Sequence, residues 1–320
     1  MIFQSRSLFT LTALAIAAFL AVPTITAQNT PCYTLESLQG AFAVVNNYGA
    51  NVALGLQAET LDGKGNLKRT GINNQPTAGS TTGQRTVSNV TSTGTYTVNC
   101  DGTGTITRLV TRADGSTASA SDDFVVTQSI ESYGRLIATT IVDAQRDPSV
   151  IVPGGIFVTR AHTLLPYAQN QDGSGPACYT AASLQGSYVV VVNYGANVAL
   201  GLQPEILDGN GNLNRTGINN QPTPGSTTGE RTVTTVTSTG TYTVNCDGTG
   251  TITRVVSRAD GTTASASDDF LITGAIERHG QLIATAIVDA QRDPSVIVPG
   301  GIFVTRTHTL APNTHSLGFR

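Results

Sequence analysis

The chain contains one sequence twice. Residues 32–164 match residues 178–310 at a constant offset of 146 positions, with no insertion or deletion, and about 107 of the 133 aligned positions are identical. Each copy has about the commonest size of a single domain, so each can bury a core of its own. The repeat therefore predicts two similar domains in tandem, not a solenoid of small units that must stack to be stable.

The N-terminus has the pattern of a secretory signal peptide. Arg6 precedes an apolar stretch from Leu8 to Val22, and Ile25-Thr26-Ala27 fits a cleavage site before Gln28. The apolar stretch is shorter than the roughly 18 residues that a membrane-spanning helix needs. We therefore expect an exported, secreted or periplasmic protein without a membrane span after cleavage.

The segments outside the copies have the composition of connectors. The linker reads PYAQNQDGSGP and is rich in Pro, Gly and polar residues, as expected of an exposed connection. The expected organisation is a signal peptide at 1–27, a first domain at 28–165, a linker at 166–177, a second domain at 178–310 and a tail at 311–320.

The positions at which the copies differ indicate that both fold. Leu109 corresponds to Val255, an apolar exchange of the kind that a core tolerates. Lys68 corresponds to Asn214, a polar exchange of the kind found on a solvated surface. Identity between the copies says little about which residues matter, because so high an identity indicates a recent duplication.

Composition and turn spacing predict an all-β fold. Charged residues make up 12% of the chain, against about 25% in typical globular domains, and Gly-containing turn signals recur between runs rich in Val, Ile and Thr. We expect two tandem antiparallel β-barrels of lipocalin-like (calycin-like) outline with about eight or nine strands each. In the first copy the expected strands are 40–47, 52–61, 66–73, 85–92, 94–99, 103–112, 118–128, 135–143 and 155–163.

Two local features can be predicted in more detail. Thr34 to Leu38 is expected to form one capped helical turn before the first strand. The second feature is the hairpin around Asp101-Gly102. There, a two-residue Asp-Gly turn would pair Val98 with Thr105. A three-residue turn with a bulge would pair Val98 with Ile106, which we prefer because it aligns the apolar residues better.

The four cysteines occupy equivalent places in the two copies, and in an exported chain they indicate disulfides. Duplication copies a self-contained domain, so the expected bonds lie within the copies, Cys32–Cys100 and Cys178–Cys246. A zinc site is the alternative, but two cysteines without a nearby histidine make a poor one.

No motif of catalysis or metal binding is recognisable. There is no Gly-x-Ser-x-Gly string, and His162 with its counterpart His308 is the only histidine shared by the copies. Asp122 and Asp123 are adjacent on an expected strand and point to opposite faces, so they cannot act as a pair. We expect no enzyme activity and no cofactor. We also expect no metal, because the DGKGN turn starting at Asp62 lacks the later residues of a calcium loop.

Two segments are candidate binding sites. The first is the turn after the first strand, with Tyr48 and Asn51 repeated as Tyr194 and Asn197. The second is the long segment that starts at Asp143. Its candidate residues are Asp143, Gln145, Arg146 and Asp147, repeated as Asp289, Gln291, Arg292 and Asp293.

Each candidate segment also has an ordinary structural interpretation. The first can be a simple hairpin turn. The second can be a structural loop in which Arg146 pairs with Asp143 or Asp147, followed by an additional edge strand. The sequence does not decide between these alternatives.

Several strings resemble a family of exported bacterial proteins of uncharacterised activity: SLQGAFAVV, LDGKGNL, GTYTVNCDGTGTITR, DDFVVT and LIATTIVDAQRDPSVIVPGGIFVTR. The resemblance covers nearly all of each copy and implies an exported β-barrel-like domain, but it supplies no activity and no site. True lipocalins carry Gly-x-Trp near their start, and this chain has no Trp.

These observations favour an exported, non-enzymatic protein that binds a small apolar or amphipathic ligand. The alternative is a structural or adhesive module that contacts a surface component, and a hydrolase with an unrecognised site is the third hypothesis. The formal net charge of −3 includes no basic run, so nucleic acid is not an expected partner.

Overall fold

The computed structural model describes residues 32–48, 53–77, 84–146, 158–166, 178–194, 199–293 and 303–311. The expected signal peptide, most of the linker, and the candidate residues Asn51, Asp147 and Asn197 lie outside the described residues. Among those that are described, no helix is long and apolar enough to cross a membrane.

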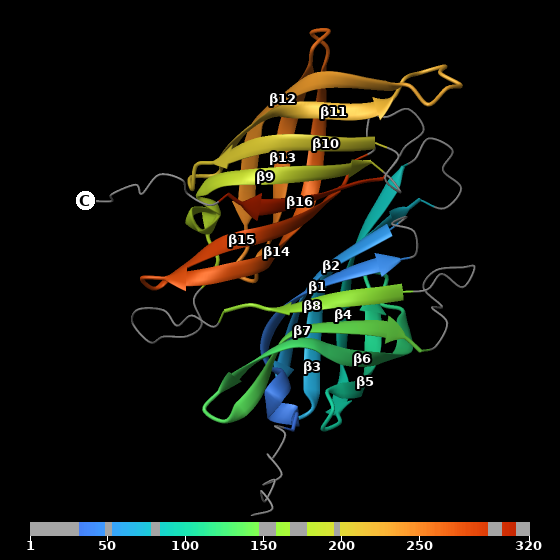
Figure 1. Cartoon of the computed structure of the whole chain (residues 1–320). Coiled ribbons are helices and arrows are strands. Elements are labelled where there is room, and N and C mark those ends of the chain that lie inside the picture. Colours follow the sequence, from blue (N-terminus) through green and yellow to red (C-terminus); the bar gives the residue numbers. More distant parts are fainter. Residues whose placement is uncertain are drawn as a thin grey trace, which may run out of the picture. The chain divides into compact units, whose positions relative to one another are not determined.

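Each copy forms a closed antiparallel barrel of eight strands, which confirms the expected fold (Figure 1). In barrel 1 every strand pairs with the strands before and after it in the sequence, and β1 closes the ring by pairing with β8. The strands of barrel 1 are β1 Gln39–Tyr48, β2 Ala53–Asp62, β3 Asn66–Pro76, β4 Arg85–Val98, β5 Thr103–Arg112, β6 Thr117–Ser132, β7 Arg135–Gln145 and β8 Val158–Leu164.

Barrel 2 has the same topology, with β16 pairing with β9. Its strands are β9 Gly186–Tyr194, β10 Ala199–Leu207, β11 Asn212–Pro222, β12 Arg231–Val244, β13 Thr249–Arg258, β14 Thr263–Arg278, β15 Gln281–Gln291 and β16 Val304–Leu310. Closure leaves no unpaired sheet edge, which is how a domain made almost entirely of strands avoids pairing with other chains.

One expected strand boundary is wrong. Residues 85–92 and 94–99 belong to the single strand β4, and Gly94 lies inside it. A Cβ at Gly94 would lie 2.1 Å from the Thr107 carbonyl oxygen and 2.7 Å from the Arg108 Cα. This glycine is therefore a point of close approach between β4 and β5, and it does not end a strand.

Both registers considered for the β4–β5 hairpin are also wrong. Val98 pairs with Gly104, and the apolar pair inside the barrel is Tyr96 with Ile106. Gly102 adopts φ +86, and the Asp101 carboxylate accepts a hydrogen bond from the Thr103 amide at 3.0 Å. The observed register differs by one residue from the Val98–Thr105 alternative and by two from the preferred Val98–Ile106 alternative.

A 3₁₀ helix precedes the first strand of each barrel, as expected. In barrel 1 it is η1, Leu35–Leu38, and the Thr34 amide donates to the Ser37 hydroxyl at 3.1 Å. The equivalent η2 of barrel 2 is Ala181–Leu184. We call the end of each barrel next to this helix the helix end, and the opposite end, where β1 and β5 finish, the far end.

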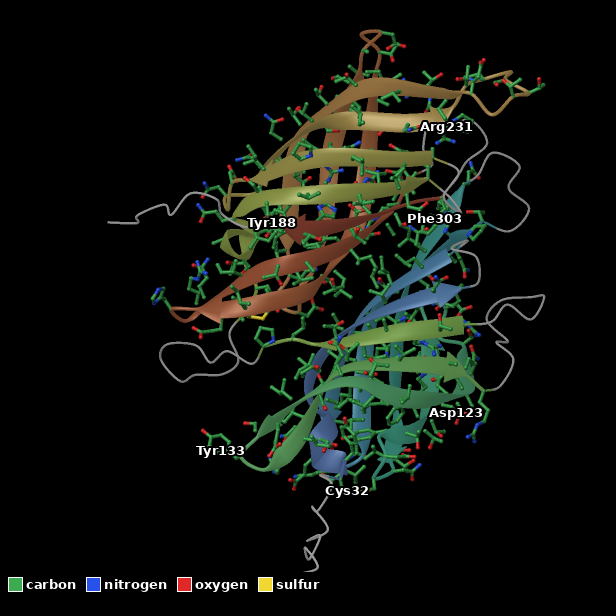
Figure 2. All side chains as sticks on the ribbon, viewed as in Figure 1. Cys32, Asp123, Tyr133, Tyr188, Arg231 and Phe303 are labelled. Atoms are coloured by element: carbon green, nitrogen blue, oxygen red, sulfur yellow. A yellow bond between two sulfur atoms is a disulfide. The ribbon has the colours of Figure 1, made fainter. Side chains whose placement is uncertain are left out.

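The disulfides are those predicted, Cys32–Cys100 and Cys178–Cys246, with Cα–Cα distances of 4.5 and 4.3 Å. Each ties the segment before the 3₁₀ helix to the β4–β5 hairpin or its equivalent, and Figure 2 shows Cys32 at the helix end of barrel 1. Two disulfides are consistent with an oxidising compartment, extracellular or periplasmic.

The helix end of each barrel is filled by apolar side chains. In barrel 1 they come from η1 and from seven of the eight strands, because alternate residues of a strand face the interior. This apolar cluster consists of Leu38, Phe42, Val44, Leu61, Leu67, Tyr96, Ile106, Phe124, Ala138 and Ile141. A ligand cannot enter from this end without displacing a packed core.

One difference between the copies lies in this cluster. Phe42 of barrel 1 corresponds to Tyr188 of barrel 2, and both side chains are buried. The additional hydroxyl of Tyr188 donates to the Ala284 carbonyl oxygen at 2.8 Å. The hydroxyl that this exchange adds is therefore hydrogen-bonded.

Candidate functional site

A layer of charged side chains crosses the middle of each barrel, between the apolar cluster and the far end. In barrel 1 they project inward from β2, β3, β5, β6, β7 and β8, and none is more than 5% exposed. We call these residues the charged layer: Glu59, Arg69, Arg108, Asp122, Asp143, Arg160 and His162.

His162 bridges two carboxylates within this layer. Its Nδ1 lies 2.8 Å from Glu59 Oε1, and its Nε2 lies 2.9 Å from Asp143 Oδ2. The other oxygen of Glu59 accepts from Arg69 Nε at 2.8 Å. Both ring nitrogens of His162 therefore have an acceptor, which is the arrangement that a doubly protonated, cationic imidazole satisfies best.

The other half of the layer is built on Asp122. Arg108 Nε donates to Asp122 Oδ2 at 2.9 Å. Arg160 Nη1 lies 2.8 Å from Asp122 Oδ1 and 2.9 Å from Asp143 Oδ1. Arg160 thus joins the two halves, and the seven side chains form one continuous network.

Barrel 2 contains the same network. His308 lies 2.9 Å from both Glu205 Oε1 and Asp289 Oδ2. Arg306 Nη1 lies 2.8 Å from Asp268 Oδ1. The charged layer of barrel 2 consists of Glu205, Arg215, Arg254, Asp268, Asp289, Arg306 and His308.

The network shifts the pKa of its members. Burial would lower the pKa of His162, but the carboxylates of Glu59 and Asp143 outweigh burial and raise it above its ordinary 6.5. Burial would raise the pKa of Glu59, but Arg69 and His162 lower it to about 2. Similarly, Arg160 and His162 outweigh burial and hold the pKa of Asp143 below its usual range.

Arg108, at the end of the network, has a pKa below its ordinary value. Burial, reinforced by Arg160 and Arg69, lowers the pKa of Arg108, and Asp122 opposes this only in part. In barrel 2 burial and Arg306 lower the pKa of Arg254 to about 10. In each layer, therefore, one guanidinium is not fully compensated by the carboxylates around it.

Neutral polar side chains lie above the charged layer, on its far-end side. Asn73 Oδ1 accepts from the Tyr48 hydroxyl at 3.0 Å and from Gln57 Nε2 at 3.2 Å. We call these three residues the amide layer. Asn46 lies next to them, since a Cβ on Gly55 would meet both Asn46 and Asn73 within 3 Å.

A pocket opens above the amide layer at the far end of barrel 1. It has a volume of about 230 Å³, which is less than the roughly 300 Å³ at which drug-sized ligands begin to fit. Asn73 contributes to it from the amide layer, and Arg112 lies at its rim. The lining residues are Asn73, Gln75, Ser88, Asn89, Val90, Val110 and Arg112.

Barrel 2 has a pocket at the same place, with a volume of about 290 Å³. Six of its lining positions correspond to those of barrel 1, with Thr in place of Ser88 and Asn89. The lining residues are Asn219, Gln221, Thr234, Thr235, Val236, Arg258, Ala259 and Asp260. We call these two cavities the far-end pockets.

The structure places the two predicted binding segments in different surroundings. Tyr48 and Tyr194 are buried, at 5% and 4% exposure, and point into their barrels. Asp143 and Asp289 belong to the charged layers. These residues therefore lie beneath the far-end pockets and do not line them.

The remaining candidates lie at the ends of β7 and β15. Gln145 and Gln291 are the last residues of these strands. Arg146 forms an ion pair with Asp123 on the outside of β6, and about half of each side chain is exposed, as Figure 2 shows for the outward position of Asp123. The expected alternative, a pair with Asp143, is wrong, because that carboxylate faces the interior.

The same arrangement recurs in the second copy. Arg292 forms an ion pair with Asp269, and Asp293 accepts a hydrogen bond from Ser267. These contacts join the residues after β15 to β14, which supports the structural interpretation of this segment.

Sequence reasoning missed the arginines of the charged layer and the pocket residues. A signal was nevertheless present. Arg108 lies between Ile106 and Val110 at the inward positions of an alternating strand, and Asp122 lies in the same way between Ala120 and Phe124. A charged residue at an inward position requires a charged partner across the barrel.

Comparison with known proteins gives no further guide: no family model, no curated protein and no solved structure matches this chain.

Proposed function

We propose that the protein is an exported, non-enzymatic binding protein in which each barrel holds one small polar molecule in its far-end pocket. The observation that carries the proposal is the pair of equivalent pockets, each floored by amide groups. Most lining side chains carry polar groups that a small polar ligand can contact. A small polar ligand would replace the water that these groups otherwise bind.

The position of the acid–base groups supports a non-enzymatic role. Glu59, Asp143 and His162 converge, as an unrecognised hydrolase would need, but they are at most 2% exposed. Both ring nitrogens of His162 are occupied by carboxylates. A general base must be able to reach the proton that it removes, and the amide layer separates this group from the pocket.

A filling variant tests the proposal. Ser88 lines the pocket of barrel 1, whereas Thr93 lies on the outer face of the same strand. We expect Ser88→Phe to abolish ligand-induced changes in the amide NMR signals of barrel 1, while those of barrel 2 persist. Thr93→Phe, the matched control, should leave both barrels responsive.

The probes are a set of small polar molecules, including sugars, amino acids, amides and carboxylates, added to the full chain. Signals of Gln75, Arg112 and their counterparts should shift, with two molecules bound per chain. If none of these probes shifts them at tens of millimolar, the proposal is wrong. The structural or adhesive role then becomes the better hypothesis, with the exposed outer hydroxyl pair Thr97–Thr105 as a feature in its favour.

A further inference from the structure

We propose that the far-end pockets select anions, and specifically small carboxylates. This inference rests on the proposed function and specifies the ligand class of the same pockets. It follows from the charge of the layer beneath them, from the hydrogen-bond donors that this layer leaves over, and from the arginine at each rim.

The charged layer contains more cationic groups than carboxylates. Arg69, Arg108, Arg160 and a protonated His162 face three carboxylates in barrel 1. A net positive charge in a medium of low dielectric constant is poorly screened, so its field extends into a neighbouring cavity.

Each layer also contains a buried donor without a hydrogen-bond partner in the part of the chain that the structure describes. Arg69 Nη1 and Arg160 Nε are buried and have no hydrogen-bond partner among the described residues. In barrel 2 the same is true of Arg254 Nε within the described part of that barrel. Buried donors without partners are unusual. In barrel 1 they add to the excess of positive charge in the layer, whereas the layer of barrel 2 also has a buried acceptor without a hydrogen bond, Asp268 Oδ2, among the described residues.

The pocket lies one strand repeat above this charge. Val110 of the pocket follows Arg108 by two residues on β5, both side chains facing inward. Two residues of a strand span about 7 Å. A carboxylate on the pocket floor would therefore lie within one Debye length, about 8 Å in physiological salt, of the layer.

A fifth cation lies at the rim of the pocket. Arg112 is half-buried, and its Nη1 donates to the Ser116 hydroxyl at 2.9 Å. Asp114 interacts electrostatically with Arg112, and its Oδ1 accepts from the Ser116 amide at 2.9 Å. The rest of the guanidinium fork can receive a carboxylate, for which its geometry is suited.

The second barrel has an arginine at the equivalent rim position. Arg258 donates to Thr262 Oγ1 at 2.9 Å, and the Asp260 carboxylate accepts from the Thr262 amide and hydroxyl at 2.9 and 2.7 Å. Asp260 lines this pocket. We therefore expect the pocket of barrel 2 to bind the same anion more weakly than that of barrel 1.

The experiment compares succinate with succinamide, which has the same carbon skeleton and no charge. Both are titrated into the full chain at constant ionic strength, and binding is followed in each barrel by amide NMR. We expect succinate to bind at least tenfold more tightly than succinamide. Arg112→Gln should weaken succinate binding at least tenfold in barrel 1 only, and Arg112→Lys, which keeps the charge, should weaken it less.

Lys68→Gln is the matched control, because Lys68 carries the same charge on the outer face of β3; it should leave succinate binding unchanged. Equal or tighter binding of succinamide would overturn the anion inference while the proposed function stands. Equal losses in the Lys68→Gln and Arg112→Gln variants would also overturn it, since the effect would then be one of net charge. Binding of neither probe at tens of millimolar would overturn the inference, and the wider probe set described above would then decide the proposed function.

Discussion

Replacing His162 by Leu tests the structural role of the charged layer most directly. The substitution keeps an apolar side chain of moderate size inside the barrel, and it removes the only groups that bridge Glu59 and Asp143. Two buried carboxylates then each lose a hydrogen bond and the neighbouring charge of the protonated imidazole. Barrel 2, with His308 intact, provides a reference within the same molecule.

The expected cost can be worked out from the burial of these groups. Glu59, Asp143 and His162 are 2%, 1% and 0% exposed, so water cannot replace the lost contacts. Removing one partner from a buried ion pair costs about 3–5 kcal/mol. With a urea m-value of about 2 kcal/mol per molar, this cost lowers the midpoint of barrel 1 by roughly 2 M.

Urea unfolding of the full chain, followed by amide hydrogen exchange and peptide mass spectrometry, resolves the two barrels. Peptides of barrel 1 should lose protection about 2 M earlier in His162→Leu, and those of barrel 2 should not change. His279→Tyr is the control, because barrel 1 carries Tyr133 at the corresponding exposed turn (Figure 2). A shift of less than 0.5 M, or an equal shift in both barrels, would refute the reasoning.

Three further predictions concern the interior of the barrels. The raised pKa of the two buried histidines contributes stability that is complete below about pH 6.5, the unfolded value, and is lost as pH rises through the folded pKa. Carboxylates with lowered pKa contribute stability above about pH 4.5 that is lost toward pH 2. Urea midpoints should therefore be highest near pH 5–6, and a double His-to-Gln variant should lose the decline above pH 6.5; an unchanged decline would contradict the assignment. Gly94→Ala should destabilise barrel 1 by at least about 3 kcal/mol, because its Cβ would overlap the backbone of β5. At Gly115 a Cβ would meet no atom within 4 Å, but the residue has φ +80, so Gly115→Ala should cost only about 1 kcal/mol. Thermal unfolding that ranks the two variants in the opposite order would refute the packing argument. Finally, Asn46 Oδ1 is buried without a partner among the described residues, so Asn46→Val should stabilise barrel 1 by about 1 kcal/mol. The reverse exchange at the equivalent position, Val192→Asn, should destabilise barrel 2 by a similar amount. Loss of stability in Asn46→Val would show that this amide makes a needed contact.

The sequence was sufficient for the architecture because the relevant signals are local or exactly repeated. Turn signals between runs rich in Val, Ile and Thr located most strands, the repeat predicted the number of domains, and the matched cysteines predicted the pairing Cys32–Cys100. The Thr34–Leu38 turn was predictable because its capping groups are three residues apart. Each of these features depends on residues that are neighbours in the sequence or copies of one another.

Features set by contacts across the barrel were not predictable in this way. Gly94 has the sequence appearance of a break, and only the position of Arg108 on the next strand shows it to be a packing requirement. His162 had the appearance of a lone histidine because its partners, Glu59 and Asp143, are 103 and 19 residues away. The far-end pocket of barrel 1 is lined by residues of β3, β4 and β5, and the register between β4 and β5 depends on the turn that joins them.

The charged layer has a physical consequence that an apolar core of equal volume would not have. Buried ion networks add little net stability compared with apolar packing, but they require a specific register. A slip of one residue in β5 would move Arg108 to the outer face and leave Asp122 with Arg160 alone. The same slip would turn the buried Ile106 and Val110 outward, so the charged layer reinforces a register that the apolar residues also favour. The same groups leave one positive charge beneath the far-end pocket, so under the proposed anion binding the layer would set the register and the preferred ligand charge together.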